Sequence, residues 1–397
     1  MTATVEHHLR PGTLQLPSLP PLALYVHLPW CLAKCPYCDF NSHEIGSTAL
    51  PEQRYLAALQ ADLESALPLV WGRPVVSVFI GGGTPSLFSS VGIESLISTL
   101  RSLLPLEPAC EITLEANPGT FERERFRAFA RAGVNRLSIG VQSFDDALLK
   151  RIGRVHDAAQ ARAAVHEASE TFDRFNIDLM YALPGQTMQQ LHADLDQALA
   201  FRPPHLSVYH LTIEPNTRFA LDPPERPDDD LANDMLDAIT DRTQSAGLNR
   251  YEVSAFARPG RECVHNLNYW QFGDYLGIGA GAHGKVSFPH RVLRQVRWRE
   301  PMTYIARALA AEAVSNEHEV ARDALAFEFM LNALRLRGGF PTTLFFERTG
   351  LPLSSIEPAL QRAEARGLIE RDAFVVRASA KGFDFLSDLQ QLFLPPA

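Results

Sequence analysis

The stretch YVHLPWCLAKCPYCDFNSH, residues 25–43, gathers three of the five cysteines of this 397-residue chain into eight positions. It begins inside LALYVHL (22–28), an apolar and β-branched run that predicts a buried strand. The cysteine loop therefore starts where that strand ends. Its spacing, C-x3-C-x2-C, is formed by Cys31, Cys35 and Cys38.

Five further strand-like runs follow along the chain and alternate with amphipathic stretches of helical length. The runs are VVSVFIG (75–81), EITLEAN (111–117), RLSIGVQ (136–142), FNIDLMY (175–181) and HLSVYHLTI (205–213). Repeated strand–helix units predict an α/β fold with a parallel sheet, here a partial (β/α)6 barrel over residues 22–215. Parallel strands bring their carboxyl ends to one rim, where such barrels carry their chemistry.

Three smaller units flank the predicted barrel. Residues 1–21 form a Pro-rich N-terminal tail, and residues 216–320 are expected to form an extension that packs on the barrel. Residues 321–397 combine helices with a short apolar run, FVVRAS, which indicates a C-terminal helical, winged-helix-like domain. The helix QRAEARGLIERD in that domain carries as many acidic as basic groups, so a packing or partner role is favoured over DNA binding.

Composition excludes several classes of function. The formal net charge of -9 does not suit a nucleic-acid-binding protein, which needs an excess of clustered Lys and Arg. The sequence has no apolar run of 18 residues and no signal-peptide pattern, so we expect a cytoplasmic protein without an integral membrane segment. Five cysteines in so long a chain do not make a disulfide framework, and Cys110 and Cys263 are interpreted as small buried residues.

The three clustered cysteines indicate a metal or cluster site. Three thiolates in one short loop suit a cubane iron–sulfur cluster, because the loop can hold three irons and leave the fourth open to a ligand. A structural zinc site needs four closed ligands, which His27 or His43 could complete. The spacing favours the cluster and leaves zinc as the alternative.

This cysteine spacing after a barrel strand resembles the radical S-adenosylmethionine (SAM) superfamily. The resemblance implies a [4Fe-4S] cluster whose open iron binds the amino and carboxylate groups of SAM, and whose electron cleaves SAM to a deoxyadenosyl radical. The glycines of GGGTPS (81–86), which let a ligand approach the backbone, and polar residues at the ends of later strands fit this implication. The implied SAM-binding residues are Tyr25, Gly82, Gly83, Thr84, Glu115, Gln142, Arg154 and Asp178.

Further motifs narrow the resemblance. YVHLPWC, KCPYCDF, FIGGGTPSL, EANPGT, NRLSIGVQSF, GRVH, DLMYALPGQT and LTIEPNT resemble the HemN-like family over residues 22–395. This family contains the oxygen-independent coproporphyrinogen III oxidases and the HemW-type heme chaperones. The oxidases carry a further cysteine two residues after the third, where this chain has Phe40, and they have a longer N-terminal extension. Both departures disfavour decarboxylation, so no catalytic residue is assigned and enzyme activity stays open.

The segment HNLNYW (265–270) resembles the heme motif of the chaperone branch. A neutral imidazole is a good iron ligand, and aromatic rings offer flat apolar surface to a porphyrin. Taken without the resemblance, the residues of HNLNYW fit a packed aromatic cluster with a hydrogen-bonded histidine at least as well as a heme site. His210 and His283 are alternative candidates for the iron ligand. The implied heme-binding candidates are His265, Asn266, Tyr269 and Trp270.

The sequence therefore supports two main functional hypotheses. In the first, a heme chaperone binds heme, a three-cysteine [4Fe-4S] cluster and SAM, and passes heme to an acceptor protein such as a respiratory enzyme. In the second, an oxidase converts two propionates of coproporphyrinogen III to vinyl groups. A radical SAM enzyme for another substrate is the third reading. The sequence does not name the acceptor, and it is compatible with a homodimer.

Overall fold

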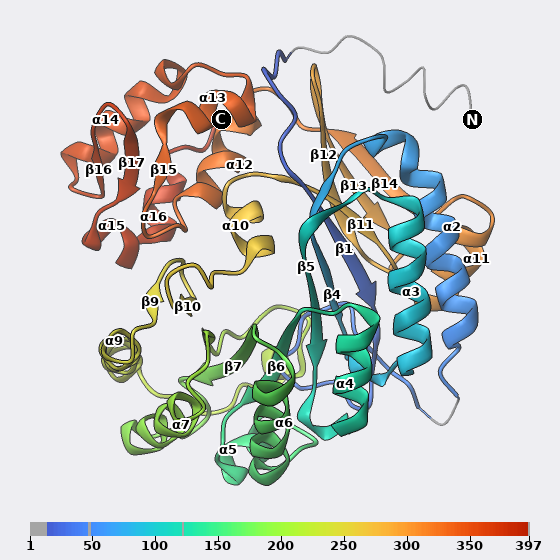
Figure 1. Cartoon of the computed structure of the whole chain (residues 1–397). Helices are drawn as coiled ribbons and strands as arrows, with labels where there is room; N and C mark the ends of the chain where they lie inside the picture. Colours follow the sequence, from blue (N-terminus) through green and yellow to red (C-terminus); the bar gives the residue numbers. More distant parts are fainter. Residues whose placement is uncertain (1–13, 47–48, 121–122, 396–397) are drawn as a thin grey trace.

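The computed structural model describes residues 14–46, 49–120 and 123–395. A curved sheet of twelve strands forms its largest unit, in the order β14-β13-β12-β11-β1-β4-β5-β6-β7-β8-β10-β9 (Figure 1). The central strands from β11 to β8 are parallel to one another. They are β11 (Asp274–Ile278), β1 (Leu22–Leu28), β4 (Val75–Gly82), β5 (Leu106–Ala116), β6 (Arg136–Gln142), β7 (Phe175–Tyr181) and β8 (His205–His210).

Antiparallel strands extend both edges of this parallel core. The part of the sheet that the structure describes ends at β14 and β9, so the barrel is open. The predicted extension, residues 216–320, supplies β11 and all the edge strands and thereby continues the sheet itself. The edge strands are β12 (His283–Phe288), β13 (Arg291–Arg297), β14 (Val314–Glu319), β10 (Ala255–Ala257) and β9 (Asn249–Arg250).

Side chains of the parallel strands alternate between an apolar outer face and a polar inner face. In β5, Ile112 and Leu114 join the main hydrophobic core, whereas Glu111, Thr113 and Glu115 point to the other side. Each apolar side chain that is fully buried in this way contributes about 1.5–3 kcal/mol to folding. The buried inner face is therefore available for polar chemistry.

Helices cover the outer face of the sheet (Figure 1). The helical connections that the sequence predicts between strands are present, as expected for parallel pairing. The helices are α2 (Glu52–Val70), α3 (Ser90–Leu103), α4 (Arg123–Ala132), α5 (Asp146–Arg151), α6 (Ala158–Thr171), α7 (Met188–Ala200), α9 (Asp229–Ser245) and α11 (Pro301–Leu309). The short α8 (Arg218–Leu221) lies instead against the cysteine loop, where the Phe219 amide donates to the Pro36 carbonyl.

The C-terminal domain has a hydrophobic core of its own. It combines helices with a small sheet of strand order β15-β17-β16. Helix α10 (Val264–Trp270) lies between this domain and the inner face of the large sheet, in contact with β1, β4, β11 and α12 (Figure 1). The elements are α12 (Ala324–Ala333), β15 (Phe340–Pro341), α13 (Thr342–Thr349), α14 (Glu357–Ala365), β16 (Ile369–Arg371), β17 (Val375–Ala378), α15 (Ala380–Asp384) and α16 (Leu386–Gln391).

The described part of the predicted N-terminal tail packs against the rest of the molecule. The backbone amides of Leu14 and Leu16 donate to the carbonyls of His290 and Pro289, in the turn between β12 and β13. Leu14 is buried in the core of the C-terminal domain. Residues 1–13 of the tail lie outside the described residues. Within the described ranges, no helix combines the length and apolarity that a membrane span needs.

Candidate functional site

The cysteine loop leaves β1 at the rim of the sheet. Its two ends are held together by a short parallel pair, β2 (Trp30–Cys31) and β3 (His43–Glu44). Gly83 and Thr84, which follow β4, donate backbone hydrogen bonds to the carbonyls of Leu28 and Trp30. The neighbouring strand end therefore braces the start of the loop, and the three cysteines are free thiols that are half-buried.

Each of the three sulfurs has its own polar neighbour. Burial raises the pKa of the Cys31 and Cys38 thiols, whereas hydrogen bonds from nearby groups stabilise a thiolate at these positions. Three soft sulfur ligands with polar support fit an iron–sulfur cluster. The contacts are Thr84 Oγ1 to Cys31 Sγ at 3.4 Å, Arg154 Nη1 to Cys35 Sγ at 3.5 Å, and Ser42 Oγ to Cys38 Sγ at 3.6 Å.

The two histidines that could complete a zinc site already have other partners. His27 accepts a hydrogen bond from the Tyr25 hydroxyl at Nδ1 (2.8 Å) and donates from Nε2 to the Asn41 carbonyl (3.0 Å). His43 contacts the Asn41 side chain at 3.2 Å. Among the described residues, no three His, Cys, Asp or Glu side chains converge on one point as zinc ligands do. A cubane needs no such convergence, because each thiolate binds a different iron.

A cavity of about 500 Å³ opens inside the sheet above these cysteines and is called the cluster cavity below. All of the SAM-binding candidates line it, as do the three cysteines. These residues come from β1, β4, β5, β6 and β7 and the loops that follow them. The structure thus brings together residues that are up to 153 positions apart, from Tyr25 to Asp178.

Two carboxylates lie at the floor of the cluster cavity. Burial raises the pKa of Glu115 to about 7, and the nearby Asp178 carboxylate adds to the shift. Glu115 accepts a hydrogen bond of 3.0 Å from the Gly82 amide. Burial also raises the pKa of Asp178, although Ser138 and Asn176 donate hydrogen bonds to it at 3.0 and 2.7 Å. A cationic ligand group would offset the desolvation of both carboxylates.

Two other polar groups at the cluster cavity have unused hydrogen-bonding capacity within the described structure. Gln142 Oε1 and Arg154 Nε are buried without a partner. Gln142 also ends β6 with a φ of 68°, in the left-handed region that costs non-glycine residues energy. Buried polar atoms normally have partners, so these two atoms mark a place where a polar ligand would complete the hydrogen bonding. The donor set therefore fits SAM.

Gly82 and Gly83 leave room that no other residue would leave. A Cβ on Gly82, where φ is 116°, would lie 2.5 Å from the ring of His27. A Cβ on Gly83 would lie 2.6 Å from the Trp30 carbonyl oxygen. The bare backbone of this turn forms one wall of the cluster cavity.

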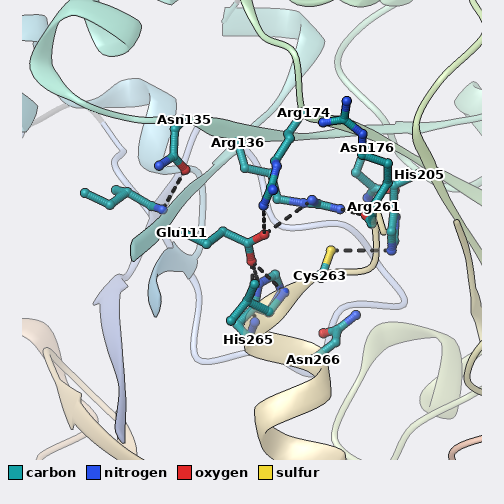
Figure 2. A network of polar contacts seen from close by, with 12 residues as sticks. Glu111, Asn135, Arg136, Arg174, Asn176, His205, Arg261, Cys263, His265 and Asn266 are labelled. Atoms are coloured by element: carbon teal, nitrogen blue, oxygen red, sulfur yellow. Dashed lines mark hydrogen bonds and ion pairs between the residues drawn. The ribbon is translucent and has the colours of Figure 1, made fainter. Parts of the chain in front are cut away.

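His265 belongs to a buried polar network at the back of the cluster cavity (Figure 2). Its Nδ1 donates to Glu111 Oε1 at 3.0 Å, and Glu111 also accepts from the backbone amide of Val264 at the start of α10. The other carboxylate oxygen of Glu111 pairs with Arg136 at 3.3 Å and with Arg174 at 3.6 Å. Glu111 therefore orients the His265 ring and holds a proton on its Nδ1.

The HNLNYW segment divides between two places. His265 and Asn266 line the cluster cavity, Tyr269 stands at its edge, and Trp270 lies outside it. Asn266 is also held by a hydrogen bond of 3.0 Å from its Nδ2 to the Tyr251 hydroxyl. Of the two competing histidines, His210 lines the cluster cavity and His283 does not. Tyr269 also lines a neighbouring cavity together with Trp270, so the segment spans two adjoining cavities.

Several residues on the inner face of the sheet line the cluster cavity although the sequence did not predict them as site residues. Cys263, interpreted only as a buried residue, also lines the cavity and lies 3.4 Å from His205 Nε2. The signal that could have found the strand residues is the alternation of polar and apolar side chains in β6, β7 and β8. The missed polar strand residues of β6, β7 and β8 include Ser138, Asn176, Ser207 and Tyr209.

Comparisons with known proteins agree with this architecture. The model of the radical SAM superfamily matches residues 25–198, and that of the HemN C-terminal domain matches residues 320–385. The chain is 46% identical to heme chaperone HemW of Escherichia coli (strain K12) over 379 residues, which cover 95% of this chain and 99% of that protein. It is 34% identical to heme chaperone HemW of Bacillus subtilis (strain 168) over 372 residues, 90% of this chain and 95% of that one.

A solved structure has the same fold over nearly the whole chain. Coproporphyrinogen III oxidase (HemN) from Escherichia coli, a radical SAM enzyme, superimposes with a TM-score of 0.82. The alignment covers 99% of this chain and 93% of that one, at 23% identity. The predicted α/β radical SAM fold with a separate C-terminal domain is thereby confirmed.

Proposed function

Because the chain belongs to the HemW family of heme chaperones within the radical SAM superfamily, we propose that it binds heme and transfers it to an acceptor protein. In this proposal the chain also holds a [4Fe-4S] cluster through Cys31, Cys35 and Cys38, and SAM beside it. The observation that carries the proposal is the near full-length relation to proteins named heme chaperone HemW.

The geometry of the cluster cavity supports the part of the proposal that concerns the cluster and SAM. When bound, the cluster would supply an open iron to chelate SAM and an electron to it. Thr84, Ser42 and Arg154 lie at the sulfurs and stabilise their charge. Glu115 and Asp178 provide negative charge for a cationic ligand, and the backbone at Gly82 lets it approach.

Phe40 supports the chaperone reading over the oxidase reading. It occupies the position of the oxidases' further cysteine, and 60% of its surface is exposed. An apolar ring at this place cannot act as a thiol, but it can contact a flat apolar ligand. The likeness to the oxidase structure concerns the fold alone.

The proposal is tested by titrating anaerobically reconstituted protein with hemin and following absorption in the Soret region. We expect saturation near one hemin per chain, followed by loss of the signal when an apo-acceptor protein is added. Coproporphyrinogen III is supplied in a parallel assay with SAM and a reductant. Vinyl product in that assay, together with no saturable hemin binding, would replace the chaperone by the oxidase.

A further inference from the structure

A second cavity, of about 610 Å³, lies next to the cluster cavity. Its volume falls within the range of about 300–1,000 Å³ that is usual for small-molecule and cofactor sites. The walls that this cavity does not share with the cluster cavity come from β11, β12, β13, α10 and α12. The residues that line both cavities are Tyr25, Asp39, Phe40, Phe79, Gly82, Glu115 and Tyr269.

Aromatic rings dominate the wall that α10 and β11 give to the second cavity. Tyr269 and Tyr275 meet edge to face at 4.9 Å between ring centroids. Trp270 of α10 also lines the cavity, and the Arg335 guanidinium lies 4.2 Å from its ring centroid. Phe40 adds an exposed ring from the cysteine loop. Such a wall suits a flat, largely apolar ligand.

Cations from β12 and β13 also line the cavity, next to Tyr275, and two of them are engaged within the protein. Lys285 is buried and paired with Asp274 at 2.9 Å. Arg294 donates to the Tyr275 hydroxyl at 2.8 Å and pairs with Glu328 at 2.5 Å. These contacts hold Lys285 and Arg294 in place and largely neutralise their charges, so neither is available to pair with a ligand.

The guanidinium of Arg299 is different, because it has no hydrogen-bond or ion-pair partner among the residues that the structure describes. It is exposed at the cavity, where its backbone is held by a hydrogen bond between its carbonyl and Asn41 Nδ2. Asp39 is the exposed carboxylate on the same cavity. Arg299 is therefore the cation that is free to bind a carboxylate of a ligand.

His283 is the available imidazole of the second cavity. It stands two residues before Lys285 on β12, so both side chains project from the same face of the sheet. Within the described ranges its ring makes no hydrogen bond. Burial lowers the pKa of His283, and the charges of Arg294 and Arg299 lower it further, which keeps it in the neutral form that binds iron. The other histidine of this cavity, His27, has both ring nitrogens engaged.

We propose that the second cavity is the porphyrin site, with the heme plane against Tyr269, Trp270 and Tyr275, the iron on His283, and a propionate on Arg299. This inference rests on the proposed function, because it assumes that the chain binds heme. The cluster cavity is the poorer alternative, since under that function its 500 Å³ already hold the cluster and SAM. His265 opens only to that cavity. The two ligands would thus meet at the shared residues, Phe40 among them.

The test compares hemin with metal-free protoporphyrin IX, which has the same propionates but no iron. Both are titrated into the wild-type protein and into His283→Ala, Arg299→Glu and His265→Ala. His318→Ala, a change at an exposed histidine of β14, is the matched control. Circular dichroism and the absorption of the reconstituted cluster check that each variant is folded.

We expect His283→Ala to change the hemin spectrum and weaken hemin binding at least tenfold, while protoporphyrin IX binding stays within about threefold of wild type. Arg299→Glu should weaken both ligands by about tenfold or more, because a charge-assisted hydrogen bond is replaced by repulsion. His318→Ala should leave both titrations unchanged. His265→Ala removes a hydrogen bond that holds α10, so any loss of binding that it causes should be equal for hemin and for protoporphyrin IX.

The inference is overturned if His265→Ala abolishes hemin binding and His283→Ala does not, which would move the heme to the cluster cavity. Unchanged binding in both histidine variants and in Arg299→Glu would also overturn it. Absence of hemin binding by the wild-type protein is a different result, because it removes the proposed function itself.

Discussion

The two cavities are neighbours, but they are built in different ways. The cluster cavity is lined mainly by inward side chains of the parallel strands and by the loops that follow them, with His265, Asn266 and Tyr269 of α10 added. The second cavity is lined by an antiparallel meander, by α10 and by Asn332 of the C-terminal domain. The first could be predicted from motifs at strand ends. The second exists only once segments from opposite ends of the chain have packed together.

The largest effect that we expect is the loss of the iron–sulfur cluster, and it should be confined to the cluster cavity. Cys35→Ala should abolish the iron and sulfide content of the anaerobically reconstituted protein, because it removes one of the only three thiolates proposed to hold the cluster. Iron and sulfide analysis measures this, with Cys110→Ala, a buried cysteine outside both cavities, as the control. Hemin binding should persist in Cys35→Ala if the second cavity works independently. Retained iron and sulfide would contradict the cluster assignment.

The next largest effect should be a loss of stability that reaches both cavities, because α10 lines both of them. Glu111→Ala leaves Arg136 buried without its counter-charge, which typically costs about 3–5 kcal/mol. It also removes the acceptor at the start of α10. Urea unfolding measures the loss. The matched control is Arg174→Ala, whose side chain is 38% exposed and whose loss should cost about 0–1 kcal/mol. An equal loss of unfolding free energy in the two variants would show that the buried Glu111–Arg136 pair contributes no more than the exposed one.

A smaller effect is a change of stability with pH, which arises from Glu115 in the cluster cavity. The folded-state pKa of Glu115, about 7, exceeds its unfolded value, so the folded chain holds a proton that the unfolded chain has lost. Stability from this group therefore falls as pH rises from about 5 to 7.5. The difference in unfolding free energy between wild type and Glu115→Gln, without SAM, should decline by about 1–3 kcal/mol over that range. Parallel pH curves for the two proteins would refute the shift.

The smallest effect should be confined to the second cavity. Trp270→Ala should weaken protoporphyrin IX binding about fivefold to tenfold, because an aromatic contact contributes roughly 0.5–1.5 kcal/mol beyond its buried area. SAM binding should not change, since Trp270 does not line the cluster cavity. Fluorescence titration measures both. Trp71→Ala, at a side chain that is 82% exposed, is the control. An equal loss of SAM binding would mean that the two cavities are not separable.

Local sequence patterns predicted much of the fold and of the cluster cavity. The strands at 22–28, 136–142 and 175–181 were predicted with the bounds that the structure has. The SAM-binding candidates were found because a parallel sheet brings its strand ends to one rim. Their binding roles stay predictions.

Other features depend on pairing that no local pattern specifies. Strand β11 adds to the free edge of β1, from which it is separated by about 250 residues, and this places His283 and Trp270 at one cavity. In HNLNYW, a helix of seven residues turns successive side chains in different directions, so His265 and Trp270 reach different cavities. The sequence suggested a single heme motif because spacing does not show which neighbours surround a helix.

The contact of Leu14 and Leu16 with the β12–β13 turn also sets an order of events during synthesis. The partners of these leucines are made about 275 residues later, which at 5–20 residues per second is a delay of roughly 15–55 s. Until then neither leucine can make the contacts that it has in the folded molecule. The segment of Leu14 and Leu16 can therefore reach its folded position only after the hairpin and the C-terminal domain have formed, which makes this contact a late step in maturation.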